Sequence, residues 1–157
     1  MTLKPAYIVF PALVITMAIA GAWATGIGLD SGWYESLNKP VLVPLNYVFG
    51  PVWTFIYILL SVALISTWSK RGDLRWPKLV AVIFIYNAVV NVLWSWAFFG
   101  WGALGLALWL ATEIWASVLV LIILLWQTNR RAAYCLWPYL LWVTLAVYLN
   151  YAIWLLN

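Results

Sequence analysis

The sequence predicts an all-α integral membrane protein built as a bundle of five transmembrane helices. Its 157 residues are 68% hydrophobic and 8% charged, whereas about 25% of the residues are charged in an average soluble domain. Five apolar runs reach the roughly 20 residues that a helix needs to cross a bilayer. They are Pro5 to Thr25, Pro44 to Trp68, Leu79 to Phe99, Ala103 to Gln127 and Ala132 to Leu156. Because little sequence is left between them, we expect one domain over residues 1–157.

The first run is expected to be retained as the first membrane helix. It is about twice as long as the apolar core of a signal peptide, and one lysine, Lys4, precedes it. Cleavage as a signal peptide is the alternative. Ala18, Ala22 and Gly26 recur every four positions, a spacing of small residues that lets two helices approach closely. This ladder fits packing within the protomer and a homodimer contact equally well.

A long polar loop separates the first helix from the second. Trp33 and Lys39 lie in it, and Pro40 favours an extended backbone at the residue before it. The loop is predicted to cover the bundle as a lid; the alternative is an interfacial loop whose aromatic side chains lie among the lipid headgroups. In the second helix, Trp53 and Tyr57 are four positions apart, so both rings lie on one face.

The third helix carries two asparagines, Asn87 and Asn91, which also share a face. Carboxamides are costly in hydrocarbon unless they find hydrogen-bonding partners. They therefore either bond to neighbouring helices or line a cavity beside Trp94. The fourth helix contains one charge, Glu113, near mid-membrane. An intramembrane carboxyl is a candidate functional group, for example a proton site of a transporter, and its alternative is a neutral acid that is bonded structurally.

The fifth helix places Trp142, Ala146 and Leu149 along one side. The small Ala146 leaves a concavity next to the Trp142 ring. We therefore predict that Trp142 forms one wall of a flat slot and that Trp53 of the second helix forms the other wall. The alternative is that these rings serve packing or the aromatic belt, because the chain has 14 tryptophans.

The basic residues predict the orientation, because cytoplasmic loops carry the excess of Lys and Arg. If five helices alternate in direction, Lys39 stands alone on one side of the membrane. Seven basic residues share the other side: Lys4, Lys70, Arg71, Arg75, Lys78, Arg130 and Arg131. We therefore expect the N-terminus in the cytoplasm and the C-terminus outside. The net charge of +4 thus reflects topology, and no nucleic-acid partner is expected.

Several chemistries are excluded by the residues that the chain lacks. It contains no histidine and a single cysteine, Cys135. A Ser-His-Asp triad, a His-ligated haem and a His-rich metal site are therefore ruled out. No glycine-rich phosphate loop is present either. We expect neither a metal nor a required cofactor.

Four ordered blocks of aromatic, proline and amide residues run along the chain. They are Trp33-Tyr34 with Leu37-x-Lys39-Pro40; Gly50-Pro51-Val52-Trp53 with Tyr57; Asn87-x3-Asn91-x2-Trp94 before Phe98-Phe99-Gly100; and Pro138-Tyr139-Leu140-x-Trp142 with Leu149-Asn150-Tyr151 and Trp154. With these blocks, nearly the whole chain resembles the translocator protein (TspO/MBR) family, whose bacterial members are the tryptophan-rich sensory proteins.

The resemblance implies a five-helix bundle, commonly dimeric, that binds porphyrins such as protoporphyrin IX or haem in a pocket closed by the first loop. In this family, Trp53 and Trp142 match the tryptophans associated with the porphyrin and with its light-dependent breakdown. The positions that match the lining of the pocket are Tyr57, Asn87, Asn91, Trp94, Ala146 and Leu149. Trp33 and Lys39 complete the predicted ligand-binding set.

The chain also departs from the family pattern. The loop motif often contains a Trp and a second Pro where this chain has Leu42 and Leu45, which weakens the aromatic lid. The sterol pattern requires a basic residue after Tyr151, and none follows. Sterol binding is therefore not expected. The acid of the fourth helix is displaced by about a turn in this chain, so no family role is assigned to Glu113.

The chemistry of a tetrapyrrole agrees with these residues. The molecule is flat, apolar on its faces and anionic at two propionates, so it requires stacked indoles and a cation or amide donors at the rim. Trp53, Trp94 and Trp142 supply the former; Lys39 and the two asparagines supply the latter. We expect a sensor, regulator or transporter of tetrapyrroles in the bacterial cell membrane. The alternatives are a light-dependent porphyrin-degrading enzyme, a transporter of another apolar molecule and a purely structural protein.

Overall fold

A computed structural model describes residues 5–157, and every regular element in that range is helical. The elements are α1 (Ala6–Asp30), α2 (Trp33–Ser36), α3 (Asn46–Ser69), α4 (Pro77–Ser95), the π-helical turn η1 (Trp96–Gly100), α5 (Leu104–Trp126) and α6 (Arg130–Leu156). With α4 and η1 taken as one span, five helices are long and apolar enough to cross a membrane. The predicted fold class is confirmed, and the chain is a multi-pass integral membrane protein. Lys4, one of the basic residues that predicted the orientation, lies outside the described residues.

Several helix boundaries differ from the predicted ones, and the structure gives a reason for two of them. α1 continues past Thr25 to Asp30, and Gly28 in this extension packs directly on the span formed by α4 and η1: a Cβ at Gly28 would lie 2.7 Å from the Phe99 carbonyl oxygen. α3 begins at Asn46 instead of Pro44, because the intervening Leu45 has an extended backbone with φ −60° and ψ 140°. The later end of α1 thus reflects a tertiary contact, and the later start of α3 reflects the local backbone conformation.

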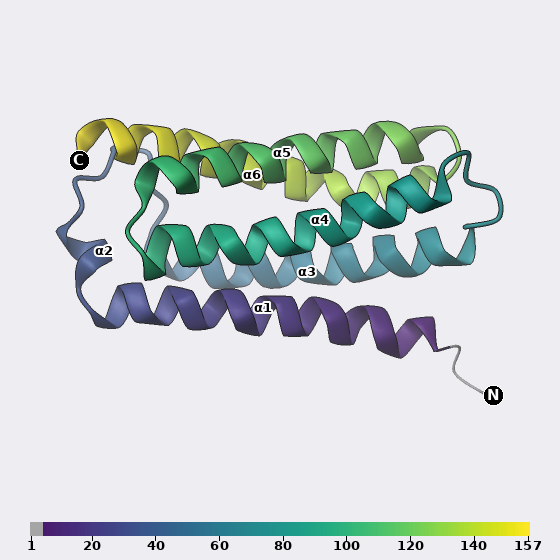
Figure 1. Cartoon of the computed structure of the whole chain (residues 1–157), viewed down its shortest axis with the longest axis horizontal. Coiled ribbons are helices and arrows are strands. Elements are labelled where there is room, and N and C mark those ends of the chain that lie inside the picture. The colour runs from purple at the N-terminus through teal and green to yellow at the C-terminus, as the bar shows by residue number, and fades with distance from the viewer. Residues whose placement is uncertain (1–4) are drawn as a thin grey trace.

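The five spans form a closed ring. α1 packs against α3 and α4, α3 packs against α6, α6 against α5, and α5 against α4. Figure 1 shows the spans running side by side, with α2 and the end of α6 at one end of the bundle, here called the α2 end. The opposite end, here called the basic end, holds the α3–α4 and α5–α6 connections. It carries Lys70, Arg71, Arg75, Lys78, Arg130 and Arg131.

The turn η1 ends the third span at the α2 end. The Trp101 amide donates to the Trp96 carbonyl at 2.8 Å, which is the five-residue spacing of a π-helix. The chain then turns sharply at Gly102, whose φ of +62° favours glycine. Such π-helical turns occur frequently at functional sites, and this one buries Phe98 beside the interior cavities described below.

The outer surface of the bundle is apolar, as a lipid-facing surface must be. Trp23 is 70% exposed, and Ile19, Ile85, Ile123 and Leu141 are exposed as well. Inside the ring, small residues such as Ala24, Ala63, Ala97 and Ala107 are fully buried, which allows the helices to approach closely. This distribution suits the bilayer as solvent.

Candidate functional site

A cavity of about 520 Å³, here called the main cavity, lies among α1, α3, α4 and η1. That volume falls within the about 300–1,000 Å³ of typical small-molecule sites. α1 contributes small residues, α3 contributes aromatic rings, and α4 contributes an amide and an indole. The lining residues are Ala18, Gly21, Ala22, Thr25, Gly26, Leu29, Tyr34, Asn46, Phe49, Gly50, Trp53, Thr54, Tyr57, Asn91, Trp94, Ser95 and Phe99.

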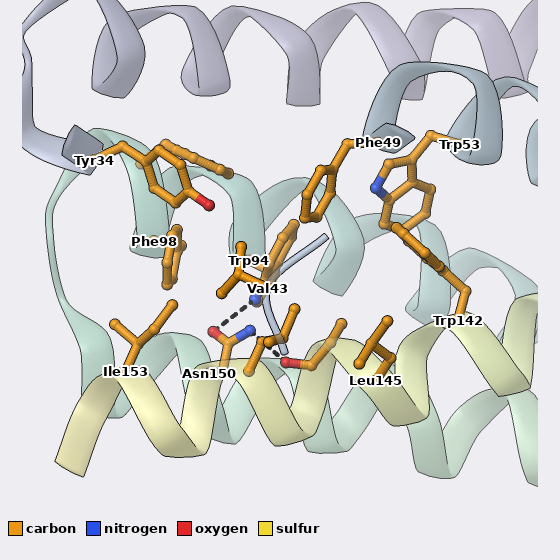
Figure 2. Close-up of a pocket in the computed structure, with 13 residues that line it drawn as sticks. Tyr34, Val43, Phe49, Trp53, Trp94, Phe98, Trp142, Leu145, Asn150 and Ile153 are labelled. Carbon is orange, nitrogen blue, oxygen red and sulfur yellow. Dashed lines mark hydrogen bonds between the residues drawn. The ribbon is translucent and has the colours of Figure 1, made fainter. Parts of the chain in front are cut away.

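A second cavity of about 50 Å³, here called the side pocket, lies next to α6 (Figure 2). Five residues line both cavities and therefore form the partition between them: Tyr34, Phe49, Trp53, Trp94 and Phe99. The side pocket is completed by Val43, Phe98, Trp142, Leu145, Ala146, Leu149, Asn150 and Ile153.

One face of α3 supplies the aromatic wall. Phe49, Trp53 and Tyr57 follow one another at intervals of four residues, so their rings lie along one stripe of the helix. Trp53 and Tyr57 are stacked, with ring centroids 5.4 Å apart and planes at 29°. Trp53 also meets the edge of Tyr139 from α6 at 6.0 Å. The indole is therefore held between α3 and α6 with a face along the main cavity.

Trp53 and Trp142, predicted as the two walls of one slot, both line the side pocket. Figure 2 shows them at the same side of that pocket, Trp53 from α3 and Trp142 from α6. The ring of Phe49 stands edge-on to Trp142, with centroids 5.5 Å apart and planes at 72°. Phe49 thus shields Trp142 from the main cavity, whereas Trp53 reaches it. Ala146 and Leu149 lie with Trp142 in the side pocket.

A buried polar network joins α4, α5 and α6 beside the main cavity. The Tyr139 hydroxyl donates to Asn87 Oδ1 at 3.1 Å and accepts from Asn91 Nδ2 at 2.9 Å. Asn87 Nδ2 in turn donates to the Ser117 hydroxyl at 2.8 Å on α5. Asn91 lines the main cavity, but Asn87 lines neither cavity. The two asparagines thus divide the roles that the sequence left open: both bond between helices, and one of them also faces the cavity.

Trp94 is fixed in the partition by a hydrogen bond. Its indole Nε1 donates to Asn150 Oδ1 at 3.2 Å (Figure 2), and Asn150 Nδ2 donates to the Ala146 carbonyl at 2.8 Å. The Trp94 ring also stacks on Phe98 at 5.9 Å with planes at 21°. This arrangement gives the partition a rigid side on α4, opposite the rings of α3.

The two predicted loop residues lie at the α2 end and line neither cavity. Trp33 packs edge-on against Phe98 at 5.4 Å. The Lys39 ammonium lies 4.5 Å above the Tyr34 ring and donates to the carbonyls of Glu35 and Leu37. Tyr34 itself lines both cavities. Burial, and then the negative charge of Glu35, raise the pKa of the Tyr34 phenol above its ordinary value, so this cap stays neutral at physiological pH.

The small-residue ladder of α1 faces the main cavity. Ala18, Ala22 and Gly26 all line it, and a Cβ at Gly26 would meet no heavy atom within 4 Å. The close contact of α1 with α4 is made by Gly21, the residue before Ala22: a Cβ at Gly21 would lie 3.1 Å from Ser95 Oγ. A role of the ladder in dimer formation stays a prediction.

Glu113 lies away from both cavities. Its Oε2 accepts a hydrogen bond from the Tyr86 hydroxyl at 2.7 Å, and Tyr86 is 41% exposed on the outside of the bundle. The carboxyl therefore belongs to the α4–α5 outer surface, where it has no direct contact with a ligand in the main cavity.

Several lining residues were not predicted from the sequence. Phe49 extends the Trp53–Tyr57 stripe by one step of four, so the helical period alone was a sufficient signal for it. The cap ring Tyr34 and the η1 rings Phe98 and Phe99 gave no such signal, because a four-residue helix and a π-helical turn leave no periodic pattern in the sequence. The role of Tyr139, whose hydroxyl bonds to both Asn87 and Asn91, had no signal in the sequence either.

Comparison with known proteins is consistent with this architecture. The TspO/MBR family matches residues 8–155. The chain is 33% identical over 145 residues to the protein CrtK of Rhodobacter capsulatus, with 92% of this chain and 91% of that protein covered. It is 34% identical over 148 residues to the tryptophan-rich protein TspO of Archaeoglobus fulgidus, with 92% of each chain covered. It is 29% identical over 152 residues to the human translocator protein, with 92% of this chain and 88% of that protein covered.

Proposed function

The chain belongs to the TspO/MBR family, and from this premise we propose that it binds a tetrapyrrole, such as protoporphyrin IX, in the main cavity. The observation that carries the proposal is the cavity of about 520 Å³ with Trp53 and Trp94 on its walls. A flat, apolar ring system is the kind of molecule that buries most area against indoles. Each such aromatic contact contributes about 1 kcal/mol beyond the area that it buries.

Polar groups at two levels suit the anionic edge of such a ligand. Asn91 lines the main cavity, and its Nδ2 donates a hydrogen bond to the Tyr139 hydroxyl. This bond holds the side chain in place, while its carbonyl oxygen, or an N–H after reorientation, can bind a ligand. Among the described residues, Lys39 is the one Lys or Arg at the α2 end, and its ammonium lies on the Tyr34 ring that caps the cavity. A propionate at this end would meet its ammonium by a short side-chain movement.

We propose a sensor or regulator of tetrapyrrole level as the first role and a transporter as the second. The position of Glu113 on the outer surface, bonded to Tyr86, supports no proton-coupled step in the cavity. Light-dependent breakdown is a further candidate role, and it would act through Trp53 first, since Phe49 stands between Trp142 and the main cavity. An excited porphyrin needs only a nearby indole or oxygen as its reaction partner.

We further propose that the N-terminus lies in the cytoplasm and that two copies form a homodimer in the bacterial cell membrane. The orientation is supported by the basic end, where six Lys and Arg residues of the described chain gather. Loops with such an excess of positive charge stay on the cytoplasmic side. The α2 end, with the first loop, would then face outward.

The test is a dark titration of the purified protein with protoporphyrin IX, followed by the porphyrin absorption band so that loss of a tryptophan does not alter the signal. Wild-type protein should saturate at micromolar ligand. Trp53→Phe should weaken binding by about fivefold to tenfold, because it removes roughly 1 kcal/mol of aromatic contact. Trp142→Phe should weaken it less, because that ring lines only the side pocket.

The matched control is Trp109→Phe, which removes an exposed tryptophan of α5 that lines neither cavity. Its affinity should equal that of the wild type. Linear, non-saturating changes that are the same in all four proteins would mean that the porphyrin merely partitions into detergent, and the proposal would fail.

A further inference from the structure

The basic end carries positive charge that its acidic residues do not balance. All six of its Lys and Arg side chains are exposed. The chain has four acidic residues, and of these only Asp73, in the α3–α4 connection, lies at this end. Asp30 and Glu35 lie at the α2 end, and Glu113 lies on α5. Within residues 5–157, none of the six basic side chains forms an ion pair, so their charge is available to an external anion.

Three arginines of the basic end lie over exposed tryptophan rings. The distances from the guanidinium carbon to the ring centroid are 4.4 Å for Arg71 over Trp68, 5.4 Å for Arg75 over Trp76 and 6.0 Å for Arg130 over Trp126. The three rings are between 36% and 53% exposed. Because tryptophan rings at the ends of membrane helices lie at the level of the lipid headgroups, an arginine over such a ring holds its charge at the same level.

Two helices begin at the basic end with cations in their first turns. Lys78 is the second residue of α4, and Arg130 and Arg131 are the first two residues of α6. Neither first turn contains an acidic residue. The N-terminus of a helix carries roughly half a positive charge, which favours anions and repels cations. An anion bound at this end would therefore relieve the repulsion between these side chains and the two helix dipoles.

We propose that the basic end is a docking surface for the headgroups of anionic phospholipids such as phosphatidylglycerol. Clusters of about four to eight Lys and Arg residues next to a membrane helix bind such lipids. The lipid phosphate accepts hydrogen bonds from guanidinium and ammonium groups, while its acyl chains pack beside the exposed tryptophan rings. The combination of charge and apolar ring surface favours a lipid over a soluble anion.

This inference goes beyond the orientation of the chain and does not depend on the proposed function. Orientation requires only that the positive charges lie on one side of the membrane. Lipid docking requires in addition that the charges stay unpaired and lie at headgroup level, as the exposure of the six side chains and the three arginine–tryptophan contacts indicate. None of the six basic residues lines the main cavity or the side pocket.

The test compares spin-labelled phosphatidylglycerol with spin-labelled phosphatidylcholine in symmetric phosphatidylcholine vesicles that contain the protein. Electron paramagnetic resonance gives the fraction of each lipid that is immobilised at the protein surface, and symmetric leaflets make the result independent of protein orientation. Phosphatidylglycerol should be preferred about twofold to fivefold, the equivalent of up to about 1 kcal/mol for a cation near an anionic lipid. At about 1 M salt, where the Debye length is about 3 Å, the preference should nearly disappear.

Two double variants locate the surface. Arg130→Gln with Arg131→Gln at the α5–α6 connection should lower the preference for phosphatidylglycerol by about half, and so should Arg75→Gln with Lys78→Gln at the α3–α4 connection. The two pairs lie on different connections, so one remains informative if the other does not fold. Lys39→Gln is the matched control, because it removes a cation at the α2 end, and it should keep the wild-type preference.

Three results would overturn the proposal. The first is equal immobilisation of the two lipids by the wild-type protein. The second is a preference that the folded double variants retain in full, or that Lys39→Gln lowers as much as they do. The third comes from glycerol phosphate, a soluble headgroup analogue, added in excess at constant ionic strength. It should leave the lipid preference unchanged, and loss of the preference would show a site for soluble phosphate instead of a lipid surface.

Discussion

The hydroxyl of Tyr139 offers the sharpest test of how the bundle is held together. Tyr139→Phe keeps the ring, and hence its edge contact with Trp53 at 6.0 Å, but removes one hydroxyl. That hydroxyl is both the donor to Asn87 Oδ1 and the acceptor from Asn91 Nδ2. Tyr139, Asn87 and Asn91 are each 2% exposed, so water does not readily replace the lost partner. The substitution therefore isolates the network from the packing.

The expected magnitude follows from these two bonds. Interhelical hydrogen bonds in membrane proteins contribute about 0.6 kcal/mol on average, with a maximum of about 1.7. Each buried polar atom that loses its partner adds a desolvation penalty of about 1–3 kcal/mol when nothing relaxes. A loss of roughly 2 kcal/mol is therefore expected for Tyr139→Phe, which corresponds to a fall in Tm of roughly 4–8 °C for a chain of this size.

The assay is thermal unfolding in detergent, followed by circular dichroism at the helical minimum. Tyr148→Phe on the same helix is the control, because Tyr148 is 43% exposed and its hydroxyl has no hydrogen bond among residues 5–157. It should unfold with the wild type. If the two variants shift by the same amount, or if Tyr139→Phe shifts by less than about 1 °C, the network does not couple the helices and the reasoning is refuted.

Three further substitutions test other contacts. Gly28→Ala should destabilise the protein by roughly 1–3 kcal/mol, because the new Cβ would lie 2.7 Å from a backbone oxygen of η1, whereas Gly26→Ala should change stability by less than about 0.5 kcal/mol in the same thermal assay. The Asn157 side chain accepts from the Asn38 amide at 3.0 Å and donates to the Asn38 carbonyl at 3.1 Å. Asn157→Ala should therefore raise amide hydrogen exchange in residues 37–45 by about thirtyfold, the equivalent of two lost bonds of roughly 1 kcal/mol each; unchanged exchange would mean that the pair with Asn38 does not hold this segment. Glu113→Gln should leave porphyrin affinity within about twofold of the wild type, and a larger loss would contradict the position of Glu113 outside both cavities.

Much of the fold is encoded locally and could be predicted. Five apolar runs of sufficient length require five membrane helices, because the bilayer leaves each backbone no other way to satisfy its hydrogen bonds. The aromatic stripe of α3 was also predictable from local sequence, because residues four positions apart, such as Trp53 and Tyr57, lie on one face of any α-helix. The extension of α1 to Asp30 was not predictable in this way, because it depends on the contact of Gly28 with η1.

The candidate site divides along the same line. The residue types were evident in the sequence, but Phe49 stands edge-on to Trp142 and lines both cavities, and only the packing of α3 on α6 shows this. The position of Lys39 on Tyr34, not on the cavity wall, likewise follows from the path of residues 37–45. Glu113 could not be placed either, because one charge on a helix does not say which side of that helix faces its neighbours.

By itself, the sequence determined that the chain spans a membrane five times and that aromatic and amide side chains stand on defined faces of its helices. It could do so because apolar length and helical period are properties of single segments. The ring order α1, α3, α6, α5, α4 and the division of the interior by Phe49 and Trp94 became evident only from the folded structure. Those features depend on contacts between residues distant in the chain, and their geometry is set by how whole helices pack.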